Sequence, residues 1–471
     1  MNLRLIFKNT SLYALADIFN KGLSFLLLPF FTMYFTPTDY GVIDTFTIFQ
    51  LILGILVNWE INQAIIRFVP ESDPGNKVTF FSSALFFIGL NAAAFCLILL
   101  VFSPYFSNIV HTDLDPLIYI TGIVNVFINI LNSFFLLVSR TQLNAGLVFK
   151  ATLANGIITV ATACMLVLYF NLGLKGYFIA MLAGSACTLL VLFAGTFALF
   201  NAKQVKKNQL RSMLAFSIPL VPSALGVFLT IYIDRVIIKE YFSDHALGLF
   251  GIAYRFALIA SILVGSYLSS IGPLIFRDYK NQNFNVILNG YLKIYVFISL
   301  ILLAGYGLFS KEAILLFTSH DSFNASMQYI YLLSLNAIAF NFYVFFPSLS
   351  IAKKTFTISL INIGAALINL GLIMALIQYL DILGILLATL ASTLTIQVLT
   401  WYFGHKQFPL EINSKDILQF IVFALVFGSI NFIDLHNGPV HFNVIAFVGK
   451  LVAFIAFVWA LYHFNFRKKT Q

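Results

Sequence analysis

Long apolar runs recur along nearly the whole chain and are separated by short polar breaks. An α-helix of about 20 apolar residues spans the ~30 Å hydrocarbon core of a bilayer. Because lipid cannot satisfy backbone N–H and C=O groups, each run is expected to be a helix. The runs lack the short, alternating pattern of membrane barrel strands. The pattern therefore predicts an all-α polytopic membrane protein.

Fourteen transmembrane helices are predicted, with ends uncertain by about 2–4 residues. They lie near 11–35, 42–66, 78–102, 116–139, 146–170, 174–200, 213–240, 247–275, 285–309, 327–350, 355–379, 382–403, 416–433 and 444–464.

Basic residues are concentrated in every second break between the predicted spans. The odd-numbered breaks carry only Lys175, Lys239 and Lys311. The even-numbered breaks and the two ends carry eighteen basic residues: Arg4, Lys8, Arg67, Lys77, Arg140, Lys203, Lys206, Lys207, Arg211, Arg277, Lys280, Lys353, Lys354, Lys406, Lys415, Arg467, Lys468 and Lys469. Cytoplasmic loops are enriched in Lys and Arg, so both termini are predicted to be cytoplasmic.

The chain also repeats itself at an offset of about 207–208 residues. TPTDYG (36–41) aligns with SDHALG (243–248), residues 111–113 with 319–321, and residues 174–176 with 382–384. Two pseudo-symmetric lobes of six helices in parallel topology fit this offset. We predict lobes at 1–207 and 208–404, followed by two appended helices at 405–471.

Composition supports the membrane assignment. The chain is 60% hydrophobic and 10% charged, whereas soluble domains carry about 25% charged residues. Its formal charge of +9 could suggest nucleic acid, but the basic residues lie in loops between spans, so no nucleic-acid partner is expected. The three cysteines all fall inside apolar runs and imply no disulfide framework. The first residues are expected to lead into the first span rather than form a cleaved signal peptide.

Charged side chains inside the spans are the candidate functional groups, since such residues are costly in a bilayer and usually line a cavity or meet a partner. Six bases and four acids fall within the predicted limits: Lys21, Lys150, Arg235, Arg255, Lys293, Lys450, Asp17, Asp44, Glu60 and Asp234.

Several charge pairs are predicted from spacing and depth. Asp17 and Lys21 are four residues apart on one helix and can touch, and Glu60 lies at a similar depth on the next. Asp234 and Arg255 match in depth across the break between spans 7 and 8. Arg235 is then left without an obvious acid. It either faces a water-filled cavity that takes an anionic cargo or extends to the outer headgroups.

Arg67 and Arg140 end spans on the predicted cytoplasmic side, and Lys150 begins one there. They reflect either the bias of cytoplasmic loops or a basic rim that collects phosphate headgroups. Prolines inside or near spans, at 29, 219, 222, 273 and 347, indicate kinks or hinges.

Enzymatic signatures are missing from the sequence. There is no GxxxxGK[ST] phosphate loop, no set of His, Cys and carboxylates for a metal, and no nucleophile–base arrangement. We therefore expect no catalytic residue, no metal and no cofactor.

Five stretches carry a resemblance to a known family. They are PFFTMYFTPTDYGVIDTF (29–46), AIIRFVP (64–70), RTQLNAGLVFKATLANGIITV (140–160), FSIPLVPSALGVFLTIYIDRVIIKEYFSDHALGLFGIAYRF (216–256) and SIAKKTFTISLINIG (350–364). With them the chain resembles the polysaccharide (O-antigen-type, Wzx-like) flippases of lipid-linked oligosaccharides, within the multidrug/oligosaccharidyl-lipid/polysaccharide exporter superfamily.

The resemblance implies two lobes around a central cavity in a bacterial cytoplasmic membrane. It implies alternating access and an undecaprenyl-diphosphate-linked oligosaccharide as cargo. A cationic cavity would hold the pyrophosphate, with Arg235, Arg255 and Lys21 as candidates. The appended helices could form a groove for the lipid tail, where Lys450 would meet a lipid head. Membrane lipid and proteins of glycan assembly are the implied partners.

Two other classes stay open at this stage. A cation-coupled exporter of small molecules could use the same fold. Its cargo is often cationic and would favour unpaired acids, whereas Asp17, Glu60 and Asp234 all have plausible basic partners. These three acids are therefore candidates either for binding a coupling ion, H⁺ or Na⁺, or for charge pairs. A membrane-embedded glycan polymerase or ligase would need a sizeable outer loop for catalytic groups, and the outer breaks here are short.

Overall fold

The computed structural model describes residues 27–69, 72–110, 114–142, 144–352, 354–437 and 441–466, with 19, 22 and 25. Within these ranges the chain is built from helices and contains no strand. Contacts divide it into two compact units, Met1–Gly248 and Leu249–Gln471. The predicted lobes follow the sequence repeat rather than contacts, so their boundaries stay a prediction.

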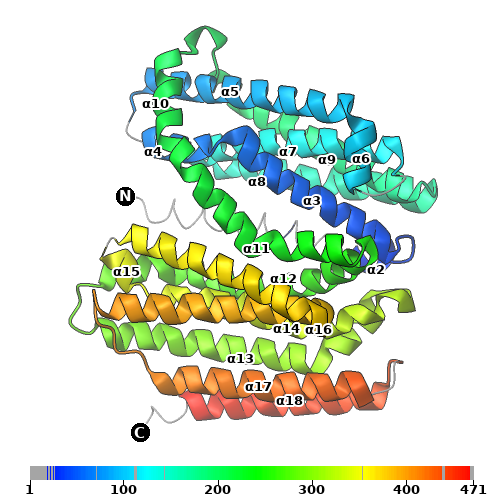
Figure 1. Ribbon diagram of the computed structural model, residues 1–471, viewed down its shortest axis with the longest axis vertical. Helices are drawn as coiled ribbons and strands as arrows, with labels where there is room; N and C mark the ends of the chain where they lie inside the picture. Colours follow the sequence, from blue (N-terminus) through cyan, green and yellow to red (C-terminus); the bar gives the residue numbers. More distant parts are fainter. Residues whose placement is uncertain are drawn as a thin grey trace. The chain divides into compact units, whose positions relative to one another are not determined.

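In the first unit, long helices run along one another, as α3, α5, α7 and α9 show in Figure 1. Its elements are α2 (Leu28–Phe31), α3 (Pro37–Asn58), α4 (Ile61–Phe68), α5 (Pro74–Val101), α6 (Ser103–Val110), α7 (Pro116–Thr141), α8 (Ala145–Ala163), the π-helix η1 (Cys164–Tyr169), α9 (Gly173–Thr196), η2 (Phe197–Leu199), η3 (Ala202–Gln204), α10 (Lys207–Ser217), η4 (Ile218–Leu220), α11 (Val221–Tyr241) and the first turn of α12.

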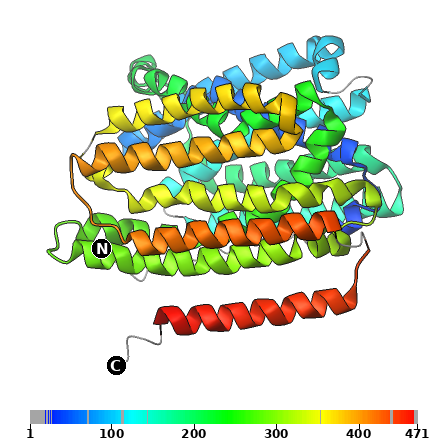
Figure 2. The same cartoon turned by 60° about the horizontal axis from the view of Figure 1, so that its bottom comes forward.

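The second unit has the same character, and Figure 2 shows α18 as its outermost helix. Its elements are the rest of α12 (Asp244–Asp278), α13 (Phe284–Phe317), η5 (Asp321–Ser326), α14 (Met327–Phe340), η6 (Asn341–Phe345), α15 (Ser348–Ile351), α16 (Thr355–His405), α17 (Ser414–Asn437) and α18 (Val444–Phe466).

Ten helices in the described ranges are long and apolar enough to cross a membrane. They cover eleven of the predicted spans, because α16 is interrupted at Asp381 (φ 50°) and holds two of them. The polytopic all-α fold is thus confirmed. The span predicted at 327–350 is divided into α14, η6 and α15, with Pro347 as the N-cap of α15. The first predicted span lies largely outside the described residues, so the total of fourteen stays a prediction.

The sequence repeat is visible in local structure. Thr36 caps α3 by accepting a hydrogen bond from the Asp39 N–H (3.3 Å). Ser243, its equivalent at an offset of 207, accepts one from the Ala246 N–H (3.2 Å) at the start of α12. Side chains of this type satisfy the N–H groups that a helix start leaves unbonded. Both repeats therefore begin their second span in the same way.

A second repeated feature is a tight turn between successive spans. A Cβ on Gly176 would lie 2.9 Å from the Leu166 side chain, and one on Gly384 would lie 2.7 Å from the Leu376 carbonyl oxygen. Both turns bring helices so close that only glycine fits. The aligned residues 174–176 and 382–384 therefore mark the same structural position in each repeat.

Polar side chains join helices inside the first unit. The Asn132 side chain of α7 donates to the Ser185 carbonyl of α9 (2.9 Å), and the Ser185 hydroxyl donates to Asn125 Oδ1 (2.6 Å). Interhelical hydrogen bonds of this kind contribute about 0.6 kcal/mol each in membrane proteins. The span containing α7 is thereby fixed against α9.

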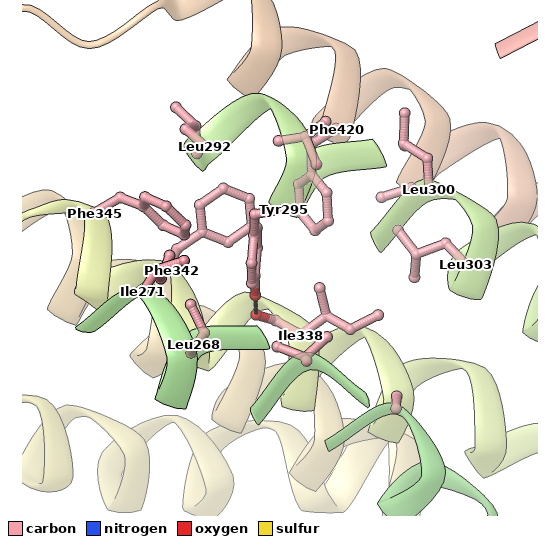
Figure 3. Close-up of a cluster of buried hydrophobic side chains, with 14 of the residues drawn as sticks. Leu268, Ile271, Leu292, Tyr295, Leu300, Leu303, Ile338, Phe342, Phe345 and Phe420 are labelled. Carbon is pink, nitrogen blue, oxygen red and sulfur yellow. Dashed lines mark hydrogen bonds between the residues drawn. The ribbon is translucent and has the colours of Figure 1, made fainter. Parts of the chain in front are cut away.

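The second unit has an aromatic core, shown in Figure 3. Tyr295 of α13 is buried, and its hydroxyl donates to the Ile338 carbonyl of α14 (2.6 Å). Its ring meets Phe342 and Phe345 of η6, with centroids 4.9 and 5.0 Å away. Phe420 of α17 packs on Phe342 (4.8 Å). This cluster joins one of the appended helices to the rest of the unit.

Candidate transport site

Arg235 and Asp234 lie on α11, a helix that packs against α3. Both are buried, each with 5% of its surface exposed. The Arg235 guanidinium lies 5.1 Å from the centroid of the Tyr232 ring, within the range of a cation–π contact. A charged guanidinium kept inside a helical unit is a candidate for binding an anion.

Arg255 lies on α12 within the second unit, where it is half-buried. Its predicted pairing with Asp234, which belongs to the first unit, stays a prediction. Asp17 and Lys21 lie outside the described residues, and so does any pairing between them. Lys293, on α13, acts electrostatically on Asp416 at the start of α17.

The three basic residues predicted for the cytoplasmic rim are all exposed. Arg67 lies in the last turn of α4, and Arg140 lies in the last turn of α7. Lys150 lies on the second turn of α8. Their positions at helix ends fit either interpretation, so a role in collecting headgroups stays a prediction.

Glu60 marks a break in the second predicted span. Here α3 ends at Asn58 and α4 begins at Ile61, and both intervening residues are left-handed: Trp59 (φ 46°) and Glu60 (φ 55°). Non-glycine residues in this conformation cost roughly 1–2 kcal/mol each. The freed Val57 carbonyl accepts a hydrogen bond from the Asn91 side chain of α5 (3.2 Å). The predicted span is therefore a discontinuous helix that carries an acid at its break.

The appended helix α18 is held by an ion cluster. The Lys450 ammonium lies 2.6 Å from Glu312 Oε1 on α13 and 2.7 Å from Asp434 Oδ2 on α17. The three side chains are 16%, 7% and 22% exposed, respectively. The suggestion that Lys450 meets a lipid head is therefore at odds with its position, because its ammonium is already shared by two carboxylates.

The sequence interpretation missed Glu312 and Asp434. The apolar pattern places Glu312 in the break at 310–326, but α13 continues to Phe317. Asp434 follows the predicted end of span 13 by one residue, but α17 continues to Asn437. The depth matching used for Asp234 and Arg255 could have found both acids, because Lys450 enters span 14 from the same side.

At the start of α3, opposite the end that carries the Trp59–Glu60 break, two glycines allow the backbones of α3 and α12 to touch. A Cβ on Gly41 would lie 1.9 Å from the Asp244 carbonyl oxygen, and one on Gly248 would lie 1.7 Å from the Pro37 carbonyl oxygen. Gly41 and Gly248 are equivalent under the 207-residue offset. The starts of α3 and α12 therefore cross in a symmetric contact that has no room for a side chain.

A lysine reinforces this end of the first unit. The Lys239 ammonium pairs with the Asp244 carboxylate and also donates to the Val110 carbonyl at the end of α6. One side chain thus joins the end of α11 to the start of α12 and to the end of α6.

In the described ranges, no three His, Cys, Asp or Glu side chains are grouped so as to hold a metal ion.

Comparison with solved structures shows which proteins share this fold. The chain superimposes on a structure titled lipid II flippase MurJ in an inward closed conformation, with a TM-score of 0.74 and 16% identity. That match covers 98% of this chain and 100% of the other. An inward-facing multidrug resistance MATE family transporter of the MOP superfamily matches with a TM-score of 0.68 and 13% identity, over 83% and 97% of the chains. This protein therefore has the fold of a polytopic transporter of the MOP superfamily.

Comparison of the sequence with known families shows the family to which the chain belongs. The pattern of the family described as polysaccharide biosynthesis protein matches residues 6–279. Because this is more than half of the chain, the protein belongs to the polysaccharide biosynthesis protein family. A relative, Lsg locus putative protein 1 of Haemophilus influenzae, is 23% identical over 286 residues, which is 59% of this chain and 67% of the relative.

Proposed function

We propose that this protein is a flippase for a lipid-linked oligosaccharide. The cargo would be an undecaprenyl-diphosphate-linked glycan, moved from the inner to the outer leaflet of a bacterial cytoplasmic membrane. The family match over residues 6–279 is the observation that carries the proposal. The lipid tail stays in the bilayer while the glycan head crosses, so the protein binds and changes shape but makes no covalent bond.

The pyrophosphate is the part of the cargo that an arginine can recognise. A guanidinium offers paired N–H donors that match two phosphate oxygens. Arg235 is buried beside Tyr232, where the low local dielectric strengthens its attraction to an anion. We assign the phosphate contact to Arg235, with Arg255 and Lys21 as further candidates.

Alternating access would require contacts that can open. The crossing of Gly41 and Gly248 and the Lys239–Asp244 pair lie at one end of α3 and α11. By the distribution of basic residues, that end would face outside and both termini would be cytoplasmic. We propose that this contact closes the outer side and separates when the cargo is released.

The test is complementation in a strain that lacks the chromosomal copy. Arg235→Ala should abolish surface glycan and raise the inner-leaflet pool of lipid-linked precursor. Arg235→Lys should recover only part of the activity, because it keeps the charge but loses the paired donors. Arg211→Ala, at an exposed site on α10, is the matched control and should export normally.

Membrane levels of each variant must be equal by immunoblot. Normal surface glycan in the Arg235→Ala strain would contradict the proposed phosphate contact. Unchanged glycan in the deletion strain, together with sensitivity to small toxic compounds, would instead identify the cation-coupled exporter that remains the second candidate.

A further inference from the structure

The break between α3 and α4 is flanked by two buried amide oxygens that have no hydrogen-bond donor among the described residues. Asn58, the last residue of α3, is 8% exposed. Its Oδ1 is buried and has no hydrogen-bond partner among the described residues. The Oδ1 of Asn62, in the first turn of α4, is buried and lacks a partner in the same way. Two amide oxygens within five residues therefore lack the donor that buried polar atoms normally have.

Between these asparagines lies a carboxylate. Glu60 is half-buried within the predicted span 42–66, just beyond the end of α3, and its hydrogen-bond partner in the described part of the chain is the side chain of Gln63. An acid in a membrane span requires a compensating positive charge or a proton. A neutral amide supplies neither a full charge nor an additional proton.

The backbone of the break adds to this negative character. The end of a helix directs carbonyl groups, and the negative end of its dipole, along the axis. At the end of α3 one freed carbonyl, that of Val57, is occupied by Asn91. Discontinuous helices in membrane transporters use such ends to coordinate small cations.

From the orphaned oxygens of Asn58 and Asn62, together with the Glu60 carboxylate, we propose that this break binds one sodium ion. The three side chains offer only hard oxygen donors, as alkali and alkaline-earth ions prefer. One carboxylate with neutral amides matches a single positive charge and is too weakly charged for a tight divalent site. The proposal does not depend on the identity of the cargo.

The site also gives a reason for the two left-handed residues. Trp59 and Glu60 interrupt the helical hydrogen bonds where Asn58, Glu60 and Asn62 would otherwise follow a regular helix. Strained conformations of non-glycine residues cluster at functional sites. Trp59 is additionally fixed by an edge-on contact with Phe87 of α5, at 5.7 Å between ring centroids.

The experiment measures ²²Na⁺ binding to the purified full-length protein in detergent, by scintillation proximity and without cargo. Wild type should retain one saturable sodium ion per chain. Glu60→Gln and Asn58→Ala should each weaken binding by at least about 10–100-fold, because removing a group that only supports a metal ligand already costs this much and these side chains would be ligands themselves. Glu411→Gln and Asn208→Ala are the matched controls, since both residues are exposed, and they should bind as wild type does.

Asn58→Asp is a second variant that distinguishes loss of a sodium ligand from misfolding caused by substitution at this position. It keeps the oxygen and adds charge, so it should bind sodium at least as tightly as wild type. The proposal is wrong if wild type shows no saturable sodium, or if Glu60→Gln binds sodium with unchanged affinity. It is equally wrong if sodium binds only after Lys21→Met, because an internal ammonium would then occupy the break. None of these results bears on whether the chain moves glycan lipids.

Discussion

Replacing Lys450 with methionine should destabilise the second unit measurably. The substitution leaves Glu312 and Asp434 facing each other without the ammonium that now lies 2.6 and 2.7 Å from them. Removing one partner of a buried ion pair costs about 3–5 kcal/mol, whereas exposed pairs are worth about 0–1 kcal/mol. Because Asp434 is 22% exposed and Glu312 only 7%, we expect a loss of about 2–3 kcal/mol.

This free energy can be read as a thermal shift. One kcal/mol lowers the Tm of a unit of about 200 residues by roughly 2–4 °C. Lys450→Met should therefore lower the unfolding midpoint of the purified protein by about 5–10 °C. The unfolding can be monitored by intrinsic fluorescence or by loss of the monodisperse peak in size-exclusion chromatography after heating. Lys415→Met, at an exposed position at the start of α17, is the control and should leave the midpoint unchanged.

The mechanism has a sharper test than the single variant. If uncompensated charge causes the loss, the triple variant Lys450→Met/Glu312→Gln/Asp434→Asn should recover most of the midpoint, because neutral replacements of a buried ion cluster are often tolerated. A triple variant as unstable as Lys450→Met would mean that packing of the lysine stem matters instead. A single variant within 1 °C of wild type would refute the electrostatic reasoning altogether.

Gly41→Ala and Gly248→Ala should each lower the thermal midpoint, because a Cβ would lie within 2 Å of a backbone oxygen. The control Gly89→Ala, where a Cβ would meet nothing within 4 Å, should raise the midpoint slightly; equal effects at the three sites would contradict the close crossing of α3 and α12. The hydrogen bond from Lys175, with that from the Leu117 N–H, holds the pKa of Asp115 below its usual value. A depressed carboxyl pKa stabilises the fold above the unfolded-state pKa, and this stabilisation is lost as pH falls through the folded-state pKa. Thermal midpoints measured across pH should therefore show Asp115→Asn to be less stable than wild type at neutral pH and equal to it in strong acid. In a cysteine-free background, Lys203→Cys and Arg211→Cys should be shielded from an impermeant thiol reagent in whole cells while Tyr379→Cys reacts, and the reverse labelling pattern would invert the proposed orientation.

The sequence by itself determined the class of fold. Insertion of a helix into lipid depends on the local density of apolar residues and on the satisfaction of its own backbone. Runs such as 285–309 and 444–464 were therefore recognisable without knowledge of their neighbours, and their helices have the predicted type. Capping at Thr36 and the tight turn at Gly176 are equally local, and so their repeats at Ser243 and Gly384 appear at nearly the same offset, 207 and 208 residues.

Tertiary structure decided which charges meet. Lys450 could be seen in the sequence as a base inside a span, but its partners are 138 and 16 residues away, on α13 and α17. Which helix faces meet depends on packing between spans, which local composition does not encode. The interruption at Trp59–Glu60 likewise has no glycine or proline to announce it. It exists because contacts such as Asn91 with the Val57 carbonyl and Phe87 with Trp59 support it from another helix.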